Sequence, residues 1–170
     1  MKKYEFTGET KRVELWNRTA TLHRIKATVE FGFVKVGELG GWIEKEENLS
    51  HEGKAWVCGD AKVWGNAKVC GDAEVWGNAK VCGDAEVFSA SHVLVIGAIG
   101  SRDDFTTFFR DKDNEITVKC GCFLGKIDKF LEKVTQTHGD SKYALVYRAA
   151  VEVARLQIDL SGEAPKDADE

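Results

Sequence analysis

A six-residue alternation of hydrophobic and polar positions runs through the middle of the chain. From Ala55 the sequence reads AWVCGD AKVWGN AKVCGD AEVWGN AKVCGD AEVFSA, a unit of the form Ala-x-Val-x-Gly-Asp/Asn. Alternation within a strand places alanine and valine on one face and the remaining side chains on the other. The Gly-Asx pair favours left-handed backbone conformations and hence a corner. The pattern predicts one short strand and one corner in every six residues, and it excludes a helix.

This repeat is typical of a parallel β-helix. The expected inward positions are Ala55, Ala61, Ala67, Ala73, Ala79 and Ala85, with Val57, Val63, Val69, Val75, Val81, Val87 and Val93. Residues 51–98 resemble the hexapeptide-repeat family of left-handed parallel β-helices, and the match continues more loosely upstream to Leu39. The resemblance implies that three units close one triangular coil, so that residues 39–98 form a domain of a little over three coils.

The outward positions of the repeat alternate between small and large side chains. They are Cys58, Trp64, Cys70, Trp76, Cys82 and Phe88. An exposed tryptophan is unfavourable, because each one has roughly 150–250 Å² to bury. Flanking segments of the same chain, a second subunit or a stacked ligand would each provide that cover. We expect Trp64, Trp76 and Phe88 to lie at an oligomer interface, and the resemblance implies a homotrimer, since such scaffolds commonly associate through these faces.

The segments on either side of the repeat have different patterns. Short alternating runs in residues 1–38 predict two or three strands that form an N-terminal β cap over the open end of the coil. Residues 99–160 predict a ββαα unit, with two strands joined by a hairpin and then two amphipathic helices. Residues 161–170 are expected to be a disordered acidic tail. The fold class is therefore mainly β, with a short left-handed parallel β-helix and a C-terminal α+β unit.

Charge and cysteine content exclude several classes of protein. The chain has 24 basic and 28 acidic residues and no basic stripe, so duplex nucleic acid is not an expected partner. It contains no apolar run long enough to span a membrane, and its start, MKKYEFTGETKRV, lacks the apolar core of a signal peptide. We therefore expect a cytoplasmic protein. Five cysteines, an odd number, argue for reduced thiols rather than a disulfide framework.

The segment GAIGSR, which follows the repeat, is the best candidate for ligand binding. Two glycines, a hydroxyl and a guanidinium suit an anion such as phosphate, although the spacing matches neither a Walker loop nor a dinucleotide fingerprint. The predicted ligand-binding residues are Gly100, Ser101, Arg102, Thr107 and Arg110. The alternative is a tight connection between domains, in which Arg102 pairs with Asp103 or Asp104.

Other chemistry-bearing residues carry weaker signals. Cys120 and Cys122 are too close together for the usual zinc-binding pair, and we expect both thiols to lie in the core. No metal ion or cofactor is predicted. Members of the hexapeptide-repeat family include acyltransferases that use a histidine as a base, and His92 lies at an outward position of the late coils. The alternative is a solvated or capping histidine, because no protruding loop accompanies it.

A second resemblance bears on function. The segments KKYEF, TLHRIKA and GELGGWIEKEENLSHEGKAWV are similar to uncharacterised phage and prophage proteins, over roughly the first half of the chain, and the C-terminal unit also resembles phage segments of unknown role. Together with the absence of catalytic groupings and the GAIGSR segment, this resemblance favours a phage-encoded, non-catalytic homo-oligomer that sequesters a small anionic, nucleotide-type immune signal in the cytoplasm of the bacterial host. The alternatives are a structural or protein-binding inhibitor module and an acyltransferase-like enzyme.

Overall fold

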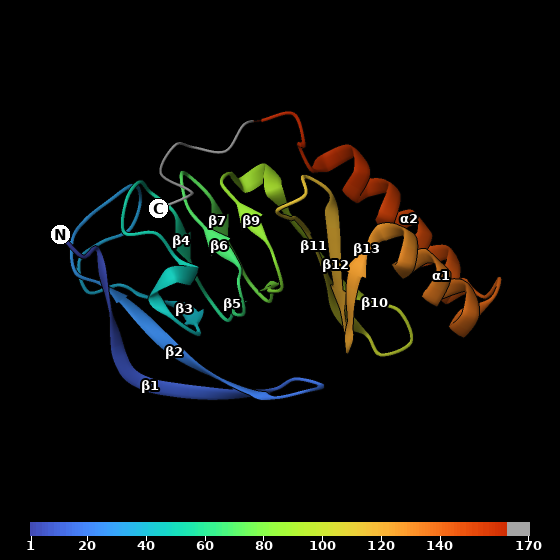
Figure 1. Ribbon diagram of the computed structural model, residues 1–170, viewed down its shortest axis with the longest axis horizontal. Coiled ribbons are helices and arrows are strands. Elements are labelled where there is room, and N and C mark those ends of the chain that lie inside the picture. Colours follow the sequence, from blue (N-terminus) through green and yellow to red (C-terminus); the bar gives the residue numbers. More distant parts are fainter. Residues whose placement is uncertain (163–170) are drawn as a thin grey trace.

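The computed structural model describes residues 1–162, which form three parts along the longest axis of the molecule (Figure 1). A long hairpin and a coil of short strands lie at one end, a four-stranded sheet lies in the middle, and two helices cover the far side of that sheet. The expectation of a mainly β chain with two C-terminal helices is confirmed. Most of the predicted acidic tail, residues 163–170, lies outside the described residues.

Short parallel strands form the coil. They are β4 (Trp56–Val57), β5 (Lys62–Val63), β6 (Lys68–Val69), β7 (Glu74–Val75), β8 (Lys80–Val81) and β9 (Glu86–Val87). The pairs β4–β7, β5–β8 and β6–β9 each join residues eighteen positions apart, such as Val57 and Val75. Three hexads therefore complete one turn of a three-sided coil. An earlier turn is supplied by β3 (Leu39–Ile43), which pairs with β5, and by Leu49, which bridges to Val69.

The interior of the coil has the predicted composition. The alanines of the repeat and its valines from Val57 to Val87 are at most 1% exposed and belong to one apolar core. Backbone hydrogen bonds join successive turns, for example from Trp56 N–H to the carbonyl of Ala73. The corners require glycine: Gly71 has φ +64°, and a Cβ there would lie 2.6 Å from the carbonyl oxygen of Phe88 in the next turn.

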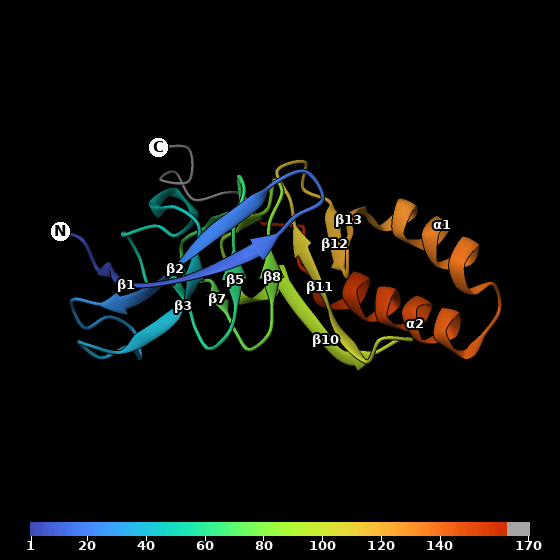
Figure 2. The same cartoon turned by 90° about the horizontal axis from the view of Figure 1, so that it is seen from below.

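The N-terminal hairpin runs along the side of the coil. Its strands β1 (Tyr4–Glu14) and β2 (Thr19–Ala27) are antiparallel, and β2 pairs with β3, which makes the five-stranded sheet β1-β2-β3-β5-β8. Both ribbon views place the tip of this hairpin close to the middle sheet (Figures 1 and 2). The predicted N-terminal strands are present, and they extend one wall of the coil as well as packing on its first turn.

The C-terminal unit contains four strands rather than the expected two. They are β10 (Val93–Ile99), β11 (Asp104–Arg110), β12 (Ile116–Cys120) and β13 (Phe123–Lys126), each antiparallel to the next. Val93, expected as the last inward valine of the repeat, still packs against the core of the coil, but it pairs with Phe109 and begins this sheet. The Gly-Asx corner is missing after Phe88, and a short 3-10 turn (Ala90–His92) redirects the chain out of the coil.

The two faces of this sheet have different neighbours. Phe109 belongs to the core of the coil, so one face closes the end of the coil and protects its strand edges. Phe108 points the other way, into a second core with α1 (Ile127–His138) and α2 (Lys142–Gln157). Asp111 joins the two parts, because it bridges to Ala85 and its carboxylate accepts hydrogen bonds from Thr117 and Lys126. Within residues 1–162, no helix has the length and apolar character that a membrane crossing requires.

Candidate functional site

A cavity of about 140 Å³ lies between the middle sheet and the two helices. Its walls come from β11, β12, β13 and both helices, and its mouth is formed by the connection from β10 to β11. The apolar part is lined by Cys120, Phe123, Phe130, Val134 and Tyr147. Ser101, Arg102, Asp104, Lys133, Thr137 and His138 supply its polar and charged side chains. The site is therefore an aromatic hollow with several hydrogen-bonding groups at its rim.

Aromatic contacts hold the walls of the cavity in place. The ring of Phe130 meets Tyr147 edge to face at a centroid distance of 5.7 Å and lies 5.5 Å from Phe123. His138 lies nearly parallel to Tyr147, also at 5.7 Å. These rings belong to three different elements that pack in one core, so the hollow is formed before any ligand enters.

Arg102 stands at the mouth of the cavity with its charge unpaired. It is exposed, and it makes no hydrogen bond or ion pair with any other residue in the described range 1–162. The nearby carboxylate of Asp104 instead accepts a hydrogen bond from the backbone of Phe105 at 2.7 Å. The guanidinium lies against Gly121, where an added Cβ would be 2.7 Å from Arg102 Nη1. The ion pair of Arg102 with Asp103 or Asp104, which was the alternative prediction, is not formed.

Gly100 acts through the backbone and not as part of the lining. Its φ is +79°, and a Cβ there would lie 1.8 Å from the hydroxyl of Tyr147. Only glycine lets the β10–β11 connection approach the tyrosine this closely. Of the predicted ligand-binding residues, Ser101 and Arg102 line the cavity, and Gly100 supports one of its walls.

Neither Thr107 nor Arg110 lines the cavity, which corrects their prediction as ligand-binding residues. The hydroxyl oxygen of Thr107 accepts a hydrogen bond from the backbone of Lys80 at 3.0 Å. Arg110 is 6% exposed, donates to Asn114 and to the carbonyl of Glu86, and covers the ring of Phe88. Because side chains alternate along a strand, Thr106 faces the cavity while Thr107 faces the coil. Both predicted residues therefore join the sheet to the coil.

The predicted interface residues differ in what covers them. Trp64 is 4% exposed, because Ala20 and Leu22 of the hairpin pack over its face of the coil. Phe88 is 6% exposed and lies beneath Arg110. The interface prediction is thus corrected for these two residues, since their own chain covers them. Trp76 is 59% exposed, and its proposed role at an interface stays a prediction.

Two cysteines lie beside the cavity. Cys120 is partly exposed and its sulfur accepts a hydrogen bond from Thr106 at 3.4 Å. Burial, together with the neighbouring Cys120, raises the pKa of Tyr147 to about 12. Cys122 is exposed, so the expectation that both thiols lie in the core is wrong for this residue. Residues 1–162 contain no cluster of three or more histidine, cysteine or acidic side chains that suits a metal ion.

His92 is buried and hydrogen-bonded to the backbone, as a structural residue is. It is 5% exposed, its Nδ1 accepts a hydrogen bond from the backbone of Phe88 at 3.0 Å, and burial lowers its pKa. Sequence reasoning missed the histidine at the cavity, His138, together with Lys133, Phe130 and Tyr147. The two aromatic residues were visible as parts of amphipathic patterns, but those patterns do not distinguish a cavity wall from a filled core.

No protein-family model matches the chain, and no curated protein shows significant similarity to it. The function proposed below is supported by the residues of the chain and their geometry.

Proposed function

We propose that this protein is a non-catalytic binding protein for a small anionic ligand of the nucleotide type. The observation that carries the proposal is the unpaired guanidinium of Arg102 at the mouth of an aromatic cavity. Arginine binds two phosphate oxygens at once through its planar fork. An exposed Lys133 and the hydroxyl of Ser101, which line the same cavity, would add donors for the remaining oxygens.

The volume of the cavity limits what enters it. An apolar cavity of about 150 Å³ holds one benzene-sized ring. The present cavity, about 140 Å³, therefore suits one flat ring, with the charged part of the ligand left outside beside Arg102. Stacking against Phe130 and Tyr147 would favour an aromatic ring such as a nucleobase.

The proposal extends to assembly, fold family and biological role. We take the three-sided coil to be a left-handed β-helix of the hexapeptide-repeat type, and the chain to be a phage protein that sequesters an immune signal. A homotrimer formed through the coil face that carries Trp76 would cover that exposed ring. Light scattering that gives three times the chain mass of 18.9 kDa supports the trimer, and a monomer at micromolar concentration contradicts it.

A binding experiment tests the central claim. The purified protein is incubated with 5′-AMP, cyclic AMP and ADP-ribose in turn, freed of excess compound and heated, and the released material is identified. Release of intact compound supports sequestration, altered compound indicates an enzyme, and no release of any probe contradicts the proposal. Titration calorimetry on the bound probe then gives the affinity for the variants.

The informative variant is Arg102→Ala, with Arg12→Ala on the exposed surface of β1 as the matched control. Loss of a charge-assisted hydrogen bond is expected to weaken probe binding by roughly 10- to 150-fold. Arg12→Ala should leave the affinity unchanged, and neither variant should lower the melting temperature. Lower stability with unchanged affinity in Arg102→Ala would show a structural role and contradict the assigned site.

A second candidate function is supported by the exposed side of α2. Leu145, Val153 and Leu156 are 61%, 47% and 89% exposed, at spacings that place them along one side of the helix. This surface favours the protein-binding alternative, in which the coil is a scaffold and the C-terminal unit contacts the partner. No observation favours the acyltransferase alternative, because His92 is buried and hydrogen-bonded to the backbone.

A further inference from the structure

A groove of about 630 Å³ lies next to the cavity, beneath the tip of the N-terminal hairpin. The hairpin contributes Trp16, Glu14 and neighbouring residues to one side, and Lys119 and Leu124 contribute to the other. The turn Gly121–Cys122, between β12 and β13, lines both the groove and the cavity. Figures 1 and 2 agree in placing the hairpin tip beside this end of the sheet. The two hollows therefore share a wall.

Two cations meet at the shared wall. Arg102 lies against Gly121 on the cavity side. Lys119 lines the groove, and its Nζ donates to the carbonyl oxygen of Gly121 at 2.6 Å, which leaves two of its three N–H groups for another acceptor. Two carboxylates also line these hollows: Glu14 accepts a hydrogen bond from the hydroxyl of Thr19, and Asp104 accepts one from the backbone N–H of Phe105. The Gly121–Cys122 turn is the place where both cations could act on one anion.

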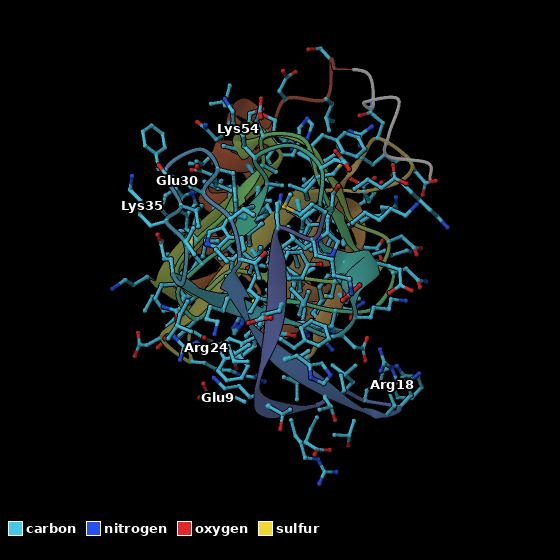
Figure 3. The ribbon with its side chains drawn as sticks, turned by 90° about the vertical axis from the view of Figure 1, so that its left-hand side faces the viewer. Glu9, Arg18, Arg24, Glu30, Lys35 and Lys54 are labelled. Atoms are coloured by element: carbon cyan, nitrogen blue, oxygen red, sulfur yellow. The ribbon has the colours of Figure 1, made fainter. Side chains whose placement is uncertain are left out.

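Trp16 offers a flat apolar surface at the far side of the groove. It is 93% exposed and makes no ring contact with another residue in the described part of the chain. The turn that carries it is anchored to the coil, because Arg18 forms a bidentate ion pair with Glu44, which also accepts the N–H of Gly65. Figure 3 shows Arg18 at this end of the hairpin. An uncovered indole on an anchored turn is a surface on which a second flat ring can stack.

We propose that the ligand carries two flat rings joined by an anionic bridge, as a dinucleotide does. One ring occupies the cavity against Phe130 and Tyr147, the bridge lies across the Gly121–Cys122 turn between Arg102 and Lys119, and the second ring stacks on Trp16. This inference rests on the proposed function, since the first ring and Arg102 belong to the site described above. It adds the groove and the hairpin tip to that site, and it names the chemical class of the ligand.

Diadenosine diphosphate, which has two adenines and a diphosphate bridge, is compared with ADP, which has one adenine and a diphosphate. Because stacking of a base on an aromatic side chain contributes about 1–3 kcal/mol, the two-ring probe is expected to bind roughly 5- to 150-fold more tightly. Trp16→Ala should remove this preference while the affinity for ADP stays unchanged. Trp16→Phe should retain most of it. Trp76→Ala, which removes another exposed tryptophan, is the matched control and should retain all of it.

The outcomes separate the two proposals. Equal affinities for the two probes in the wild-type protein, or an unchanged preference in Trp16→Ala, would overturn the two-ring inference and leave the single-ring site intact. Failure of both probes to bind would contradict the proposed function and this inference together. Quenching of tryptophan fluorescence by diadenosine diphosphate, absent in Trp16→Ala, would be direct support. An unchanged melting temperature in Trp16→Ala shows that the variant is folded.

Discussion

Trp64 and Trp76 allow a test of what covers the coil, because their local sequences are nearly identical. They occupy the same position in the units AKVWGN and AEVWGN, yet Trp64 is 4% exposed and Trp76 is 59% exposed. We predict that Trp64→Ala destabilises the protein far more than Trp76→Ala does. The reason is that the hairpin packs over Trp64, with Ala20 and Leu22 in contact with the same cluster.

The size of the difference follows from the area involved. Trp76 keeps somewhat more than half of its surface in water, whereas Trp64 keeps almost none. A buried tryptophan removes roughly 150–250 Å² from water, and each Å² of apolar area contributes about 25 cal/mol. The two substitutions should therefore differ by about 2–3.5 kcal/mol in the free energy of unfolding. In a chain of this size, that difference corresponds to roughly 5–10 °C in melting temperature.

Urea unfolding of both variants at two protein concentrations measures this difference. Association through the Trp76 face would make the loss in Trp76→Ala depend on protein concentration, whereas the loss in Trp64→Ala should not depend on it. If Trp64→Ala and Trp76→Ala lose the same free energy of unfolding, at the lower and at the higher protein concentration alike, the reasoning is refuted. The hairpin would then not protect Trp64 from water in solution.

Two further predictions concern the backbone and a buried charge. Gly100→Ala should lower the free energy of unfolding by about 1–3 kcal/mol more than Gly139→Ala, since both have positive φ but only a Cβ at Gly100 meets Tyr147. Equal losses in urea unfolding would contradict this. Burial lowers the pKa of Lys3 to about 8, below its value in the unfolded chain. As pH rises, the folded protein therefore loses this proton at a lower pH than the unfolded chain does. The free energy of unfolding consequently increases as pH rises through 8. The stability advantage of Lys3→Met over wild type should therefore shrink between pH 7 and pH 9, about one unit below and above that pKa. A difference between the two proteins that does not change with pH would argue against this prediction.

Part of the candidate site was predictable from the sequence. The GAIGSR segment has the composition of a turn that binds anions, and Ser101 and Arg102 do line the cavity. The sequence could not show that Thr107 and Arg110 contact the coil rather than the cavity. That depends on where the helices and the coil pack against the sheet. The aromatic wall comes from elements that are distant along the chain, so no local motif marks it.

The sequence by itself determined the strand-and-corner repeat and its inward valines and alanines. Those features depend on interactions within a few residues, namely strand alternation and the positive φ that a Gly-Asx corner adopts. Only the tertiary structure decided that Trp64 is covered and Trp76 is exposed, and that Val93 leaves the coil to begin a sheet. The physical reason is that hexads with the same local sequence have different neighbours, and burial depends on packing between segments far apart in the chain.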